Sequence, residues 1–127
     1  MLNKVHLIGR LGRDPELRYT PLENTAVCTF SLATNEKWKD KSGKYQERVE
    51  WHNIVTYRHT AEYVANNLKK GDSVFLEGKI QSRKYKAKDG SQKTVYEIIV
   101  HDARKLGTNT QEPVNPLPTD YDDDVPF

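Results

Sequence analysis

Five short runs of β-type sequence constrain the fold of this 127-residue chain more than any other feature. They cover residues 4–11, 25–34, 47–57, 73–85 and 94–100. They are rich in β-branched and aromatic residues, and the second and third runs alternate between two faces, which is typical of half-buried strands. One face of the second run carries Ala26, Cys28, Phe30 and Leu32, and one face of the third carries Val49, Trp51, Asn53, Val55 and Tyr57. The pattern predicts an all-β body.

Turn signals separate the runs. Asp14-Pro15 ends the first run, because proline interrupts a strand. Asp89-Gly90, between the fourth and fifth runs, is a strong signal for a tight hairpin. Residues 37–44, which follow the second run, predict another hairpin tip.

A single amphipathic helix is expected between the third and fourth runs. Its apolar residues recur at helical spacing as Ala61, Val64, Ala65 and Leu68. Thr60 is placed to cap the N-terminus, and Gly71 to follow the C-cap. Lys69 and Lys70 then fall in the last turn, where they favour the helix dipole. Five strands with one helix between the third and fourth match the oligonucleotide-binding (OB) fold, a five-stranded Greek-key barrel.

The charges are divided unevenly along the chain. Of 20 Lys and Arg and 18 Asp and Glu residues, residues 107–127 hold no base and five acids, so residues 1–106 carry a net charge of +7. This division suggests a nucleic-acid partner for the body and another role for the tail. We expect a domain at residues 1–106, a short disordered linker at 107–119, and an acidic tip at 120–127.

Aromatic residues interrupt the basic stretches of the body. Trp38 lies between Lys37 and Lys39, and Tyr85 follows Arg83-Lys84. A protein that holds single-stranded nucleic acid needs cations for the phosphates and exposed rings on which bases stack. Burying a tryptophan flanked by lysines would draw charge into the core, so we interpret Trp38 and Tyr85 as stacking platforms. Trp51 and Tyr57 fit the same role, but they could also fill the barrel.

Enzymatic chemistry finds little support in the sequence. It contains no Gly-rich phosphate loop, no Gly-x-Ser-x-Gly elbow and no His-Glu-x-x-His pair, and its histidines are scattered. Cys28 is the single cysteine, and we interpret it as a small buried residue. We expect no enzymatic activity, no metal and no cofactor. No apolar run approaches the roughly 18 residues of a membrane span, and no targeting segment is evident, so we expect a cytosolic protein without a membrane partner.

Long collinear motifs carry a resemblance to a known family. They are residues 2–16 (LNKVHLIGRLGRDPE), residues 32–38 (LATNEKW), Glu50-Trp51-His52, and residues 68–78 with LKKG and LEG. With these motifs the chain resembles the bacterial single-stranded DNA-binding proteins of replication, recombination and repair. The resemblance implies an OB barrel that assembles as a homotetramer with DNA wrapped around it. It also implies a cytoplasmic, nucleoid-associated protein of a bacterium, and leaves open a phage or plasmid origin.

The resemblance further implies roles for particular residues. Its base-stacking aromatics correspond to Trp38, Trp51, Tyr57 and Tyr85, and its DNA-binding cations to Lys4, Lys41, Lys70, Arg83 and Lys84. His52 falls where the family has a tetramer-interface histidine. The end of the chain, Asp122, Asp123, Asp124, Val125, Pro126 and Phe127, is similar to the peptide by which the family docks onto helicases, nucleases, polymerase accessory subunits and recombination mediators.

The linker departs from the family, and two alternatives stay open. Its 13 residues span on the order of 20 Å, so we expect less support for contacts between neighbouring tetramers. The body could instead be an RNA-binding or protein-interaction module of the same barrel class. The acidic tail, with its net charge of −5, could also fold back onto the basic body when DNA is absent.

Overall fold

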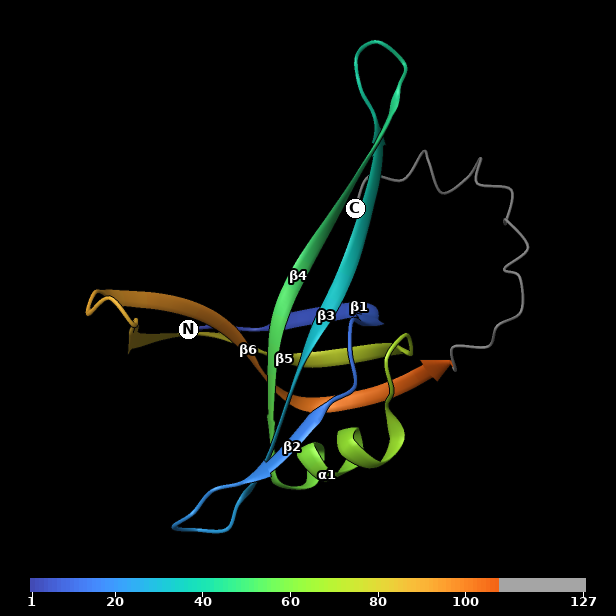
Figure 1. Cartoon of the computed structure of the whole chain (residues 1–127). Helices are drawn as coiled ribbons and strands as arrows, with labels where there is room; N and C mark the ends of the chain where they lie inside the picture. The colour runs from blue at the N-terminus through green and yellow to red at the C-terminus, as the bar shows by residue number, and fades with distance from the viewer. Residues whose placement is uncertain (108–127) are drawn as a thin grey trace.

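Six strands and one helix make up residues 1–107, the part of the chain that the computed structural model describes (Figure 1). The strands are β1 (Val5–Leu11), β2 (Glu16–Tyr19), β3 (Ala26–Lys39), β4 (Tyr45–Tyr57), β5 (Ser73–Lys86) and β6 (Gln92–Gly107). The helix α1 (Arg58–Asn67) lies between β4 and β5. The five predicted runs correspond to β1, β3, β4, β5 and β6.

The strands close into a barrel. They follow the order β1-β5-β6-β4-β3-β2, and β1 returns to pair with β3 through Arg10 with Ala33 and Leu11 with Leu32. The β4–β6 pair is parallel and all the others are antiparallel. Gly9 permits the closure, because a Cβ at this position would overlap the carbonyl oxygen of Ala33. The predicted OB barrel is therefore confirmed.

The predicted inward face of β3 forms the centre of the core. Ala26, Cys28, Phe30 and Leu32 are all buried, and Leu76 of β5 and Val100 of β6 meet them from across the barrel. The helix covers one end of the barrel, at the bottom of Figure 1, and contributes Ala61, Val64 and Leu68 to the same cluster. Full burial of one such leucine or valine stabilises the fold by roughly 1.5–3 kcal/mol.

The boundaries of the helix differ from the prediction. It begins at Arg58 with Tyr57 as N-cap, so the expected cap at Thr60 is wrong. The hydroxyl of Thr60 instead donates to the carbonyl oxygen of His101 on β6, a tertiary contact that no local pattern reveals. The helix ends at Asn67, so Lys69 and Lys70 lie beyond its last turn. Gly71, at φ 88°, turns the chain toward β5 rather than following the C-cap.

One strand was not predicted, and another is longer than expected. β2 follows the Asp14-Pro15 break and pairs only with β3, and its four residues are exposed, so it lacks an apolar alternation. β3 runs through Trp38 to Lys39, which places Trp38 in a strand rather than in a turn. The ladder from Val27–Tyr57 to Lys39–Tyr45 explains the extension, because each residue of β3 in this ladder has a partner on β4.

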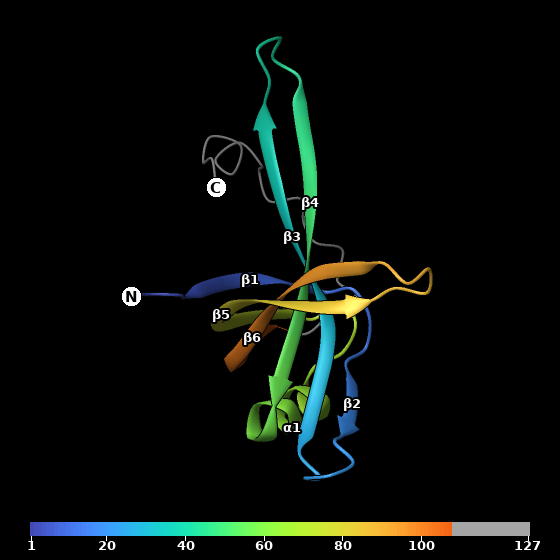
Figure 2. The same ribbon diagram turned by 90° about the vertical axis from the view of Figure 1, so that its left-hand side faces the viewer.

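Two hairpins project from the barrel. Figure 2 shows β3 and β4 continuing far beyond the other strands as a two-stranded ribbon, while β5 and β6 form a second, shorter one. The tips contain Gly43 at φ 85° and Gly90 at φ 88°, as the turn signals predicted. Apart from Gly107, the predicted linker and acidic tip lie outside the described residues.

Candidate nucleic-acid interface

The outward face of β4 carries the first two aromatic platforms. In the antiparallel ladder, Trp51 lies opposite Ala33 and Tyr57 opposite Val27, so each ring has a smaller neighbour on the same face. Trp51 is 58% exposed and Tyr57 is 45% exposed. These rings therefore do not fill the barrel, and the alternative that they belong to the core is wrong.

Trp51 lies over the backbone at the end of β1. The amide of Gly12 donates to the carbonyl oxygen of Ser31 (3.0 Å), which fixes this segment beside β3. A Cβ on Gly12 would overlap Cζ3 of the Trp51 ring and would lie 2.8 Å from Cη2. The indole thus occupies the space that a side chain at position 12 would take, and the missing side chain determines where the ring lies.

The β5–β6 hairpin contributes a cation, Arg83, and a third ring, Tyr85. Arg83 Nε lies 3.1 Å from Glu97 Oε1, and Nη2 lies 3.3 Å from Oε2, so the guanidinium is held in one plane. The pKa of Arg83 is raised, first by the hydrogen bond to Glu97 and then by that carboxylate's charge, with smaller contributions from Tyr57 and Tyr85. Both tyrosines therefore lie within electrostatic range of the guanidinium.

A hollow of about 320 Å³ separates the two platforms of β4. It is lined by Asn53 and Val55, the outward residues between Trp51 and Tyr57, and by Arg13, Arg83 and Glu97. Arg13 forms no ion pair with any residue of the described range 1–107. The rings, the arginines and this hollow form one surface, which we call the aromatic face: Arg13, Trp51, Asn53, Tyr57, Arg83 and Tyr85.

Trp38 lies on the β3–β4 ribbon, away from the aromatic face. It is opposite Gln46 and 40% exposed, and the alternation along β3 places it on the other side of the ribbon from Trp51. Asp40 organises the tip beyond it, since its Oδ1 accepts hydrogen bonds from the amides of Ser42 and Lys44, at 2.9 Å each. The Ser42 hydroxyl also donates to Oδ1. This hydroxyl bond, which has the largest effect, and the two amide bonds lower the pKa of Asp40. Lys41 lies in this same turn.

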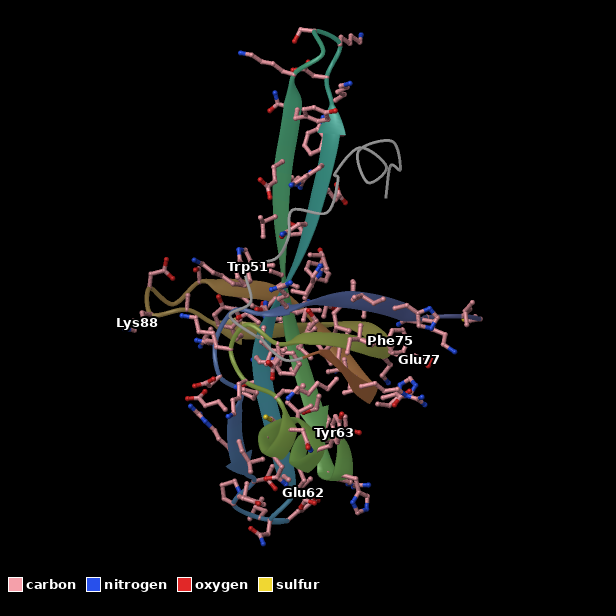
Figure 3. All side chains as sticks on the ribbon, turned by 90° about the vertical axis from the view of Figure 1, so that its right-hand side faces the viewer. Trp51, Glu62, Tyr63, Phe75, Glu77 and Lys88 are labelled. Carbon is pink, nitrogen blue, oxygen red and sulfur yellow. The ribbon has the colours of Figure 1, made fainter. Side chains whose placement is uncertain are left out.

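The predicted cations are not gathered in one place. Lys84 neighbours Arg83 on β5 but alternates to the other face, and Lys70 follows α1, where its amide donates to Asp14 Oδ1 (2.9 Å). Lys4 is engaged elsewhere, because its ammonium lies 2.8 Å from Glu77 Oε1. Figure 3 shows Glu77 and Phe75 on the side of the barrel opposite Lys88 of the β5–β6 tip. Lys4 is therefore separated from the aromatic face.

His52 lies on the side of β4 that faces away from Trp51. Its Nε2 lies 2.9 Å from the Thr34 hydroxyl, and it lines a hollow of about 920 Å³ together with His6, Ile8 and Phe75. This second surface adjoins β1, and we call it the β1 face. None of the predicted stacking residues lines this hollow.

Sequence reasoning missed Arg13 and Asn53 of the aromatic face, and several residues outside it that support the rings. Asn53 was visible in the alternation of its strand, but Arg13, between β1 and β2, and Glu97, on β6, come next to it only through the fold. No sequence pattern marks Gly12, because its importance depends on the Trp51 ring that lies against it. Tyr45 was also overlooked; its ring lies 5.0 Å from the Lys39 ammonium at the tip of the ribbon.

Residues 1–107 present neither a metal-binding cluster nor a membrane-spanning helix. No three His, Cys, Asp or Glu side chains within this range lie close enough together to hold a metal ion. The one helix of this range is too short and too polar to cross a bilayer.

The closed barrel and the exposed rings on its outer face define an oligonucleotide-binding fold. Residues 2–106 match the family model described as "Single-strand binding protein family", and the chain belongs to that family. Proteins of this family bind DNA and are not enzymes, as the sequence predicted. The resemblance inferred from the motifs is confirmed.

Individual relatives agree with this assignment. The single-stranded DNA-binding proteins of Neisseria meningitidis serogroup A and of serogroup B are each 58% identical over 106 residues, which is 84% of this chain. The matched part spans 60% of the length of those relatives. A solved structure titled "Plasmodium falciparum SSB complex with ssDNA" superimposes with a TM-score of 0.78 at 34% identity, and covers 84% of this chain and 97% of that one.

Proposed function

We propose that the chain binds single-stranded DNA without regard to sequence and protects exposed strands during replication, recombination and repair. The observation that carries the proposal is the set of exposed rings, Trp51, Tyr57 and Tyr85, the last two of which interact electrostatically with the guanidinium of Arg83. Stacking on such rings contributes roughly 1–3 kcal/mol per base, and arginines attract phosphates. Neither interaction reads base edges, so any sequence is accepted. Membership of the family and the DNA complex of the Plasmodium relative support the proposal.

Tryptophan fluorescence provides the test. Titration with oligo-dT should quench the fluorescence strongly and stoichiometrically, and salt should weaken binding with a slope of about 0.7 per phosphate contact. Competition with poly-U and duplex DNA separates this function from that of an RNA-binding module. A protein that is not quenched, or that prefers RNA or duplex, would contradict the proposal.

The remaining cations are proposed to guide the strand beyond the aromatic face. Lys41 and Lys84 lie on the two projecting hairpins, close in sequence to Trp38 and Tyr85. Lys70 lies near the β1–β2 junction, where Asp14 holds its backbone. Lys4 acts only through long-range attraction while Glu77 holds its ammonium.

The β1 face is proposed to mediate assembly into a homotetramer. Residues 5–9 of β1 pair with β5 on one side, and their other edge meets no strand within residues 1–107. Ile8 on this strand is 63% exposed beside the hollow that His52 lines. An unpaired edge with apolar side chains favours pairing with a second copy. Light scattering with and without oligo-dT should report four chains per particle, and a monomer would contradict the proposal.

The end of the chain is proposed to recruit genome-maintenance proteins, namely helicases, nucleases, polymerase accessory subunits and recombination mediators. Phe127 offers an apolar anchor and a terminal carboxylate, and Asp122, Asp123 and Asp124 suit a cationic rim. Val125 and Pro126 complete the peptide. Deleting residues 122–127 should abolish capture of such partners from a bacterial extract while the protein still binds DNA. Undiminished capture would contradict this role.

The same deletion tests whether the tail competes with DNA for the body. If it does, the truncated chain should bind oligo-dT more tightly at low salt, because the acidic tip, tethered by a short linker, no longer occupies the basic surface. Unchanged affinity at low salt would exclude the competition. We place this activity in the bacterial cytoplasm, at the nucleoid.

A further inference from the structure

Arg58 has a backbone conformation that arginine rarely adopts. It directly follows Tyr57 and sits at φ 56°, in the left-handed region where a Cβ is unfavourable. Asn24, at φ 52°, is the only other non-glycine residue with positive φ in the described range 1–107. Asparagine tolerates this conformation better than arginine does. Strain of this kind tends to persist at functional sites, where the surrounding structure enforces it.

Arg58 lines a hollow next to the β2–β3 loop, which contains Asn24. It has a volume of about 420 Å³ and is lined by Thr20, Glu23, Thr25, Tyr57 and Arg58, while Asn24 lies between two of these residues in the β2–β3 loop. We call it the β2–β3 hollow. Its volume falls within the range of roughly 300–1,000 Å³ that is usual for ligand pockets. Tyr57, one of the platforms of the aromatic face, is among its lining residues.

The charge of Arg58 is not used by the fold. Its side chain is exposed and forms no ion pair or hydrogen bond with any residue of the described range. Glycine would accept the same φ without steric cost, so the backbone alone does not explain an arginine here. An unpaired guanidinium beside a stacking ring is suited to a phosphate next to the stacked base.

We propose that the β2–β3 hollow is a nucleotide subsite that continues the DNA path past Tyr57. It takes the nucleotide next to the one stacked on Tyr57, and Arg58 contacts the phosphate between them. Glu23 lines the same hollow, and its negative charge repels a phosphate. The affinity of the subsite therefore depends on the balance between Arg58 and Glu23. This inference rests on the proposed binding of single-stranded DNA.

The test uses Arg58→Gly in the full chain. Relief of the strain should raise the melting temperature, by about 4 °C for a domain of this size. Loss of the phosphate contact should weaken binding of an oligo-dT of about 8 nucleotides by about 8-fold at 50 mM salt, and lower the salt slope by about 0.7. Arg58→Lys should retain the slope of the wild type, and Glu23→Gln should tighten binding. A merely structural arginine would not produce opposite changes in stability and affinity.

Two outcomes would overturn the subsite. One is wild-type affinity and slope in Arg58→Gly. The other is an equal loss in Arg104→Gln, a control that removes an arginine of β6 paired with Asp102 at 3.4 Å, since the effect would then reflect net charge alone. Oligo-dT binding by the wild-type protein distinguishes failure of this inference from failure of the proposed function. If the wild type does not bind oligo-dT, the function fails; if it binds and the Arg58 variants bind equally well, only the subsite fails.

Discussion

Gly12→Ala should displace Trp51 and leave the fold intact. The new Cβ would overlap Cζ3 of the indole and lie 2.8 Å from Cη2, whereas ordinary contact begins at 3.4 Å, so Cη2 must retreat by at least 0.6 Å. The atoms that must move belong to the far end of an exposed side chain, and φ of Gly12 is not positive. The backbone amide at position 12 keeps its hydrogen and can still donate to the carbonyl oxygen of Ser31. The cost to folding is therefore small.

The cost to binding follows from the stacking energy. Full loss of one stacked base costs roughly 1–3 kcal/mol, or about 5- to 160-fold in affinity. Displacement of the Trp51 ring should weaken oligo-dT binding by at least about 5-fold, and by no more than Trp51→Ala does. Fluorescence anisotropy of a labelled oligonucleotide measures the affinity, and thermal unfolding checks the fold.

A double-mutant cycle identifies the mechanism. If Gly12 acts only by seating the indole, Gly12→Ala should change affinity by less than about 2-fold in a Trp51→Ala background. Wild-type affinity in the single variant would refute the role of Gly12. An equal loss in both backgrounds would show that the substitution acts through the backbone instead.

Three further predictions concern charges and burial. Glu97→Gln should free the guanidinium of Arg83 for phosphate, so oligo-dT should bind about 3-fold more tightly at 50 mM salt with a steeper salt slope; weaker binding would show that the carboxylate's positioning of Arg83 matters more. Folding lowers the pKa of Asp40 below its ordinary value of 3.8, so its contribution to the ribbon tip is present above that pH and is lost as the pH falls below it. Hydrogen-exchange protection of the Ser42 and Lys44 amides should then disappear, whereas retained protection would contradict the assignment. Burial, with a smaller effect of Glu16, raises the pKa of Cys28 to about 11, so a thiol reagent near neutral pH should label it only in unfolded protein, and rapid labelling of the folded chain would contradict its burial.

The sequence identified those parts of the fold that depend on local patterns. The alternation from Ala26 to Leu32 marked the buried face of β3, and Asp89-Gly90 marked a hairpin, because both signals lie within one segment. The helix start and β2 were missed, since Thr60 finds its partner on β6 and β2 is held only by its pairing with β3. Local sequence cannot reveal such long-range partners.

The candidate site divides in the same way. Trp51 and Tyr57 could be placed on one face by counting along the strand, yet only the structure shows that this face points outward. Trp38 and Trp51 were both predicted as stacking residues, and the ladder places them on alternate sides of the ribbon. A strand that stacks on both tryptophans would have to pass around the ribbon. The position of Glu97 beside Arg83 depends on the β5–β6 register, which places Arg83 opposite Val95 and Gln81 opposite Glu97.

Exposed rings that hold the bases, beside cations that hold the phosphates, are the central feature of the proposed DNA binding. The most direct measurement compares oligo-dT with an abasic oligonucleotide of equal length and equal charge, by anisotropy at one salt concentration. Each base that stacks on Trp51, Tyr57 or Tyr85 adds roughly 1–3 kcal/mol, so the abasic strand should bind at least about 100-fold more weakly. Equal affinity for the two strands would show that binding is electrostatic alone and would contradict the role of the rings.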